Sequence, residues 1–177
     1  MRFLIGSDIH GSLKYARLFF KEADSYDKIL LLGDLYYNGA RNDPPELYQP
    51  KEVVKLLNSF KDKIIAVKGN CESEVDQMVS LFSISEKATI FAFQKTMTLV
   101  HGHHESMGNC PYDFGDVFLQ GHTHVSVLKK EGGKFFLNPG SLSLPKDGKH
   151  SYMTMDEKEI ILYDLLSGER VSSLAWN

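Results

Sequence analysis

Short apolar runs that end in polar, glycine-containing turns recur along the 177-residue chain. In the front half they predict three buried strands, at Phe3 to Ser7, Lys28 to Leu32 and Ile64 to Val67. Helical periodicity predicts helices from Leu13 to Ala23 and from Val53 to Phe60 between them. Right-handed crossovers in this β-α-β-α-β order bring all three strand ends to one edge of a parallel sheet.

The pattern changes after a short predicted helix at Glu74 to Leu81. Seven short strands with tight connections are predicted at Ala88 to Phe93, Met97 to Val100, Val117 to Leu119, Val125 to Leu128, Phe135 to Leu137, Tyr152 to Met155 and Ile160 to Tyr163. Residues 130–134 and 156–158 are typical of hairpin turns. A parallel front half and an antiparallel back half predict an α/β fold with two packed sheets and helices outside. No linker or repeat interrupts it, so we expect one domain over residues 1–177.

Composition excludes several classes of protein. The formal charge of −3 argues against a general nucleic-acid binder, which normally has a basic face. No apolar run reaches the roughly 18 residues of a membrane span, and the start of the chain turns polar too early for a signal peptide. Cys71 and Cys110 do not form a disulfide framework, which favours a reducing, cytoplasmic setting.

Seven side chains that could hold divalent metals stand in five short blocks, each where an apolar run stops. They are Asp8, His10, Asp34, Asn70, His101, His122 and His124. Adjacent parallel strands lie about 4.8 Å apart, so the first three strand ends could bring Asp8, Asp34 and Asn70 together. Two carboxylates this close would repel unless a cation lies between them.

The donor types limit the metal and the substrate. Carboxylate, amide and imidazole donors suit manganese, iron or zinc, and the near absence of thiolate argues against a structural zinc site. Two dications bring about +4 and two carboxylates about −2, so a hydroxide and a mono-anionic phosphodiester would neutralise the rest. This charge balance favours a diester over a monoester only weakly.

Each block alone has an ordinary interpretation. Asp8 could cap a helix beside a surface histidine, and the Gly-Asp and Gly-Asn pairs are common turns. His122 and His124 could lie on the solvent face of a strand. His103 and His104 are, by default, surface histidines. The order of all five blocks, each at a strand end, favours the metal interpretation.

In this order the blocks Asp-x-His, Gly-Asp, Gly-Asn, His and Gly-His-x-His resemble the calcineurin-like metallophosphoesterase superfamily, and more closely the small bacterial YfcE-type phosphodiesterases. The resemblance extends to residues 7–12, 39–42, 69–78 and 138–141 and covers nearly the whole chain. It implies a four-layer α/β/β/α sandwich with two mixed β-sheets, the metallo-dependent phosphatase fold.

The resemblance also implies roles for the seven residues. Asp8, His10 and His124 would hold one metal, Asn70, His101 and His122 a second, and Asp34 would bridge them. The two divalent ions would be manganese first, with iron, zinc, nickel or cobalt as alternatives. A hydroxide between them would attack phosphorus in line.

One position departs from the superfamily pattern, because many members have a histidine where this chain has Cys71. A neutral thiol is a poorer proton donor, so we expect slower hydrolysis of diesters with poor leaving groups unless His103 substitutes. Cys71 could equally be a small buried filler. The candidate catalytic residues are Asp34, Asn70, Cys71 and His103. Arg41 and Asn42, in the proline-rich loop after Asp34, are candidate substrate contacts, with a solvent-exposed loop cation as the alternative for Arg41.

The sequence therefore predicts a metal-dependent phosphodiesterase acting on small phosphodiesters. Phosphomonoester or phosphoprotein hydrolysis at the same site is the first rival. A non-catalytic scaffold, like the retromer subunit of this fold, is the rival from another class. No membrane partner is expected, and a nuclease is disfavoured by the lack of a basic channel. Trp176 and the apolar tail could pack on the core or on a partner, which leaves a homo-oligomer open.

Overall fold

The beginning and the end of the chain share one sheet. The computed structural model describes residues 1–177, and its larger sheet has the strand order β12-β11-β10-β1-β2-β3-β4. The strand bounds are β1 Phe3–Gly6, β2 Lys28–Leu31, β3 Ile64–Val67, β4 Ile84–Ser85, β10 Ser151–Met155, β11 Glu159–Asp164 and β12 Arg170–Ala175. Strands β1 to β4 pair in parallel, as predicted for the first three, and β10 to β12 add antiparallel.

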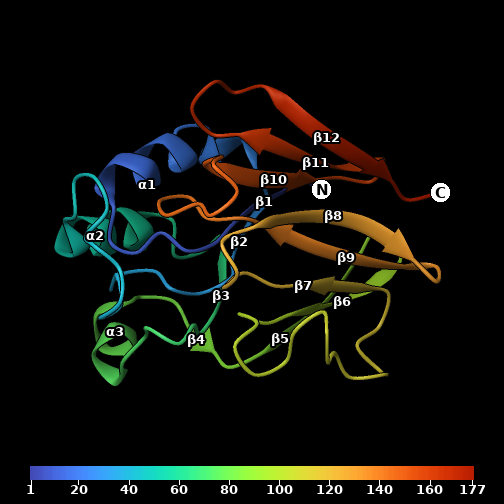
Figure 1. Cartoon of the computed structure of the whole chain (residues 1–177), viewed down its shortest axis with the longest axis horizontal. Helices are drawn as coiled ribbons and strands as arrows, with labels where there is room; N and C mark the ends of the chain where they lie inside the picture. The colour runs from blue at the N-terminus through green and yellow to red at the C-terminus, as the bar shows by residue number, and fades with distance from the viewer.

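The smaller sheet packs face to face against the first (Figure 1). Its order is β5-β6-β7-β9-β8, with bounds β5 Ala88–Ala92, β6 Lys95–Leu99, β7 Val117–Leu119, β8 Ser126–Glu131 and β9 Lys134–Pro139. It is also mixed, because β6, β7 and β9 are parallel and the two outer strands antiparallel. A buried apolar cluster that includes Ile5, Leu30, Leu99 and Leu119 fills the space between the sheets.

Helices cover the outer face of the larger sheet (Figure 1). The helices are α1 Leu13–Phe20, α2 Pro50–Ser59 and α3 Glu74–Val79, with a 3-10 turn at Ala23–Ser25. Residues of α1 and α2 such as Phe19 and Leu57 pack against Leu4 and Leu31 of the sheet in a second buried cluster. The longest helix has ten residues, and none has the length and hydrophobicity that crossing a membrane requires.

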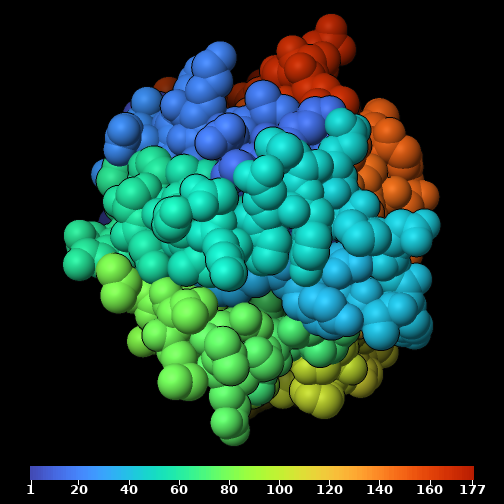
Figure 2. All heavy atoms as spheres, turned by 90° about the vertical axis from the view of Figure 1, so that its left-hand side faces the viewer, coloured from blue at the N-terminus to red at the C-terminus, as the bar shows by residue number.

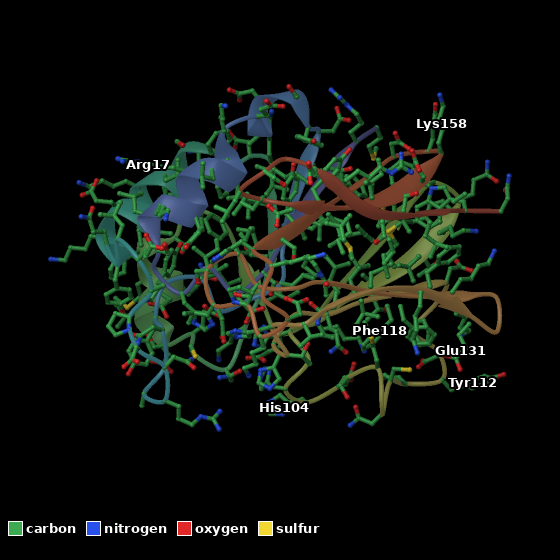
Figure 3. All side chains as sticks on the ribbon, turned by 45° about the horizontal axis from the view of Figure 1, so that its top comes forward. Arg17, His104, Tyr112, Phe118, Glu131 and Lys158 are labelled. Atoms are coloured by element: carbon green, nitrogen blue, oxygen red, sulfur yellow. The ribbon has the colours of Figure 1, made fainter.

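A loop rather than a helix covers the outer face of the smaller sheet. Residues 102–116 lie there, with Phe114 packed edge-on against Phe118 of β7 at 5.3 Å between ring centroids. Figure 3 labels His104 and Tyr112 on this loop. Gly108, Pro111 and Gly115 disfavour a helix in this segment. The predicted fold class is confirmed, with two mixed sheets and helices outside, and this loop occupies the position of the fourth layer.

The structure differs from the sequence prediction at several element ends. Strands β4 and β12 were not predicted, since β4 has two residues and the β12 side chains are mostly exposed, so neither has a hydrophobic signature. The first helix ends at Phe20 rather than Ala23, and the second begins at Pro50, where proline suits a first turn. Trp176 packs on the core, 5.0 Å from the Phe135 ring, and donates its indole N–H to the Asp156 carbonyl.

Candidate metal centre

Five of the seven predicted ligands lie just beyond the strand ends in a backbone conformation that is rare for residues other than glycine. Positive φ angles occur at Asp8 (56°), His10 (48°), Asp34 (55°), His122 (66°) and His124 (58°). Such residues cost of order 1–3 kcal/mol each, and they persist only where the surrounding structure fixes them. Strain concentrated at one edge of the sheets indicates a functional site there.

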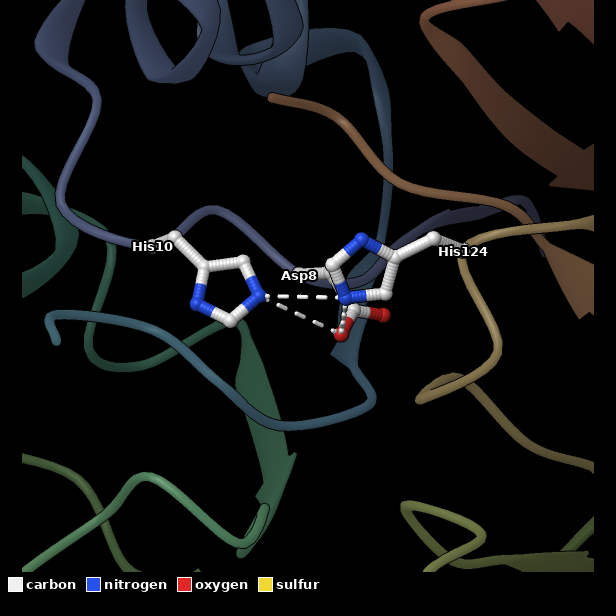
Figure 4. Close-up of side chains that lie close together, drawn as sticks. All are labelled: Asp8, His10 and His124. Atoms are coloured by element: carbon white, nitrogen blue, oxygen red, sulfur yellow. Dashed lines mark hydrogen bonds and ion pairs between the residues drawn. The ribbon is translucent and has the colours of Figure 1, made fainter. Parts of the chain in front are cut away.

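Asp8, His10 and His124 form one half of the centre (Figure 4). His124 Nε2 lies 3.1 Å from Asp8 Oδ1 and 3.2 Å from His10 Nε2. The other carboxylate oxygen of Asp8 accepts hydrogen bonds from the Ser7 hydroxyl and the His122 N–H. That leaves Asp8 Oδ1, which is buried, without a hydrogen-bond partner.

Backbone carbonyls fix the orientation of these two imidazoles. His10 Nδ1 lies 2.8 Å from the Tyr37 oxygen and His124 Nδ1 lies 2.5 Å from the Leu144 oxygen, so each Nδ1 carries the donated proton. In the neutral rings both Nε2 atoms are then acceptors, and they face each other and Asp8 Oδ1. Three acceptors around one point need a cation or a proton between them.

His101, Asn70 and His122 form the other half. The Nδ1 of His101 donates to the Leu32 carbonyl at 2.6 Å, so its Nε2 lone pair faces inward. Around that Nε2 lie Asn70 Oδ1 at 3.1 Å, His122 Nδ1 at 3.2 Å and Asp34 Oδ2 at 3.4 Å. His122 thus faces this half through Nδ1, whereas His10, His101 and His124 face the centre through Nε2.

Asp34 lies between the two halves. Its Oδ2 is 3.7 Å from His10 Nε2 as well as 3.4 Å from His101 Nε2, and its Oδ1 accepts the Cys71 N–H at 2.9 Å. Burial raises the pKa of Asp34, but the contact with His101 outweighs it, so the pKa lies below its usual value. The carboxylate is therefore ionised and oriented toward both halves.

Glu72 is a component of the site that the sequence did not predict. Its buried carboxylate accepts the N–H groups of Asp34, Leu35 and Gly69, which joins the ends of β2 and β3. Burial and the neighbouring Asp34 charge raise the pKa of Glu72 to about 7. The only sequence signal was its position two residues after Asn70, inside a segment of family resemblance.

These residues fit divalent metal ions. The unpartnered Asp8 oxygen and the inward-facing imidazole nitrogens are what a cation would satisfy. Burial lowers the pKa of His101, yet the Asp34 and Asp8 carboxylates raise it to about 9, which shows how strongly this position favours positive charge. Carboxylate, amide and imidazole donors together suit borderline divalent metals.

A cleft of about 800 Å³ opens onto the centre. Its lining comprises His10, Asp34, Tyr37, Gly39, Ala40, Arg41, Asn42, Asn70, Cys71, His122, Thr123, His124 and Lys146. Arg41 and Asn42, the candidate substrate contacts, thus line the cleft, although the Asn42 amide donates to the Asn38 carbonyl and closes the loop. Cys71 also lines the cleft, with its sulfur in a group of potential ligand atoms with His10 and Asp34. Lys146 was not predicted.

His103 lies on another wall of the centre. Its ring centroid is 5.5 Å from that of His101 and 6.2 Å from that of His122, and it lines a separate hollow with His104 and Glu105. Its buried Nδ1 has no partner. Burial and the neighbouring His101 lower the pKa of His103, so it is neutral at pH 7.

Two glycines allow the close packing of the centre. A Cβ atom at Gly69 would collide with Asp34 Oδ1, and one at Gly121 would collide with the Ser7 hydroxyl that holds Asp8. The glycines of the Gly-Asn and Gly-His blocks are therefore required sterically, beyond their role in turns.

Comparisons with known proteins agree with this geometry. The chain belongs to the calcineurin-like phosphoesterase superfamily, whose domain matches residues 1–159. It is 36% identical over 177 residues to Phosphodiesterase YfcE of Escherichia coli K12, covering 97% of this chain and 95% of the relative. The solved structure of that phosphoesterase superposes with a TM-score of 0.95 over all of both chains.

More distant structures share the fold alone. An archaeal phosphodiesterase has a TM-score of 0.68 at 20% identity, covering 99% of both chains. Vps29 of Entamoeba histolytica, solved with zinc, has a TM-score of 0.64 at 21% identity and covers all of both chains. The predicted family is confirmed, and with it a metal-dependent phosphoesterase as the class of enzyme.

Proposed function

We propose that this chain is a metal-dependent phosphodiesterase that hydrolyses small phosphodiesters. The observation that carries the proposal is the cluster of seven side chains whose acceptor atoms converge beside one polar cleft. The similarity to a full-length relative named as a phosphodiesterase supports the same reaction. Cys71 and Cys110 are both free, which suits a reducing compartment such as the cytoplasm.

Two divalent ions, manganese first, would be held by the two halves of the centre. Asp8, His10 and His124 would hold one, Asn70, His101 and His122 the other, and Asp34 both. When bound, such ions lower the pKa of a water and offset charge that develops on the phosphoryl oxygens.

The chain's own groups set what else the site can do. Backbone carbonyls hold His10, His101 and His124 in the tautomer that faces inward. Arg41 would donate a charge-assisted hydrogen bond to the phosphoryl group. Burial raises the pKa of Cys71 to about 12, so its thiol is neutral and adds no charge to the cleft. A site with so weak an acid suits esters whose leaving groups depart without protonation.

Hydrolysis of bis(p-nitrophenyl) phosphate tests the proposal. We expect metal-stripped protein to be inactive, manganese to restore turnover, and Asp34→Asn to abolish it. Asp113→Asn, which changes an exposed carboxylate on the 102–116 loop, is the matched control and should keep activity. A metal-loaded protein that cleaves p-nitrophenyl phosphate but no diester would make monoesters the substrate instead. Absence of turnover on both would favour the scaffold.

A further inference from the structure

The cleft contains two cations that have no partner in the protein. Arg41 and Lys146 both line it, and the side chain of neither residue forms a hydrogen bond or an ion pair. The only carboxylate in the lining is Asp34, which is turned toward His10 and His101. Two uncompensated positive charges therefore face the space that a substrate would fill.

Lys146 is held beside the metal centre by its backbone. Its N–H donates to the His124 carbonyl at 2.9 Å, and the carbonyl of Leu144 in the same loop accepts the His124 Nδ1 proton. Asp147 anchors the loop further by accepting the N–H and hydroxyl of Ser126 at 2.8 and 2.7 Å. Figure 2 shows orange atoms of this part of the chain next to the light-blue atoms of the segment around residue 40. The backbone of Lys146 is thus fixed, while its side chain is free to reach a ligand in the cleft.

The charge of a simple diester does not account for both cations. Two dications with Asp8 and Asp34 leave about +2, which a mono-anionic phosphodiester and an anionic nucleophile offset. Arg41 belongs to the loop that lies against Cys71, because a Cβ atom at Gly39 would come within 3.2 Å of the Cys71 sulfur. Lys146 approaches from the His124 side. That charge balance uses neither cation. Arg41 is assigned to the scissile phosphoryl group, which leaves Lys146 without a ligand.

We propose that Lys146 binds a second phosphate of the substrate, so that the preferred substrates are phosphodiesters with a further phosphate on one of the esterified alcohols. The inference rests on the proposed phosphodiesterase function and makes its substrate class specific. A lysine ammonium is a common phosphate ligand that acts as a point charge. The Tyr37 side chain in the same lining is 46% exposed, which gives the substrate's organic part an aromatic surface.

A matched pair of chromogenic esters tests the proposal. The p-nitrophenyl ester of thymidine 5′-phosphate has one phosphate, and its 3′-phosphorylated form differs only by the second. We expect kcat/KM for the 3′-phosphorylated ester to be about tenfold higher, as one partly solvated charge pair would give. Lys146→Gln should bring the ratio near one. Lys149→Gln, an unpaired lysine of the same loop outside the cleft, should keep both the ratio and the turnover of bis(p-nitrophenyl) phosphate.

The outcomes separate this inference from the proposed function. If bis(p-nitrophenyl) phosphate is cleaved but the two thymidine esters are used equally, the second-phosphate subsite is wrong and the phosphodiesterase stands. If no diester is cleaved, the proposed function itself fails. A preference that survives in Lys146→Gln would assign the second phosphate to another group and overturn the role of Lys146.

A readout independent of turnover completes the test. Lys146 and Lys149 are both exposed amines, so an acetylating reagent should modify both. We expect thymidine 3′,5′-bisphosphate to protect Lys146 severalfold, and thymidine 5′-phosphate to protect it little, as measured by mass spectrometry. Lys149 should be protected by neither. Equal modification of Lys146 with and without the bisphosphate would contradict the proposal.

Discussion

Glu72 Oε2 accepts the backbone N–H of Asp34 at 2.9 Å, across the gap between the ends of β2 and β3. The same carboxylate also binds the N–H groups of Leu35 and Gly69. It therefore fixes the turn from which the Asp34 carboxylate reaches both halves of the centre. Glu72, which does not line the cleft, thus sets the geometry of the residue that lies between the two halves.

We expect Glu72→Gln to weaken manganese binding by about 10- to 100-fold, the range for partners that orient metal ligands. A glutamine amide has one acceptor oxygen and would turn its NH2 group toward a backbone N–H. Calorimetric titration of manganese into the metal-free protein measures the change. Glu74→Gln, a neighbouring exposed carboxylate on α3, should bind manganese as the unaltered protein does. Equal affinities in the two variants would show that Glu72 does not position Asp34.

Metal should also stabilise the fold, because a bound cation satisfies the converging acceptors. At a manganese concentration 100 times the dissociation constant, binding to the folded state raises the free energy of unfolding by about 2.7 kcal/mol. For a chain of this size that corresponds to a rise in Tm of roughly 5–10 °C. Scanning calorimetry with manganese and with chelator measures it. An unchanged Tm at saturating manganese would contradict a preformed site.

The strand ends explain why so much of the centre was predictable. Asp8, Asp34 and Asn70 follow three successive parallel strands, and parallel order alone places those ends together. Glu72 and Lys146 were missed for the opposite reason. Glu72 acts by reaching back 38 residues to the Asp34 N–H, and Lys146 enters the cleft because its loop is bonded to His124. Neither contact leaves a pattern in the local sequence.

Parts of the fold also depend on contacts that leave no pattern in the local sequence. Strand β12 exists because its backbone pairs with β11, not because its side chains are buried, so its sequence lacks the alternation of polar and apolar residues that would predict a strand. The loop over the smaller sheet likewise depends on a few aromatic contacts such as Phe114 with Phe118. Where an apolar run is buried almost throughout, as in β1 to β3, the sequence sufficed.

Cys71 should limit the range of leaving groups. Burial and the Asp34 charge keep its thiol neutral, with a pKa of about 12, so it is a poor acid for a departing alkoxide. We expect Cys71→His to change kcat little for diesters with a p-nitrophenyl leaving group, such as methyl p-nitrophenyl phosphate. For dialkyl phosphates we expect kcat to rise at least about tenfold, because a general acid contributes a factor of about 10² or more to the rate. For a series of diesters, the slope of log kcat against the pKa of the leaving group measures proton donation to that group. An identical slope in Cys71→His and Cys71→Ser would show that this position does not supply the proton.

Acid should loosen the loop that holds Lys146. Burial raises the pKa of Asp147, but the N–H and hydroxyl of Ser126 outweigh burial and lower it below the usual value. A carboxyl with a depressed pKa stabilises the folded state above its unfolded pKa, and that contribution is lost as pH falls through the folded pKa. We expect Asp147→Asn to lower the free energy of unfolding by about 1 kcal/mol at pH 7, given solvent competition at this exposed site, and by progressively less as pH falls below the usual carboxyl pKa of 3.8. Urea unfolding of the two proteins at several pH values measures the difference. A cost that stays constant down to pH 2 would show that the ionised carboxylate contributes nothing here.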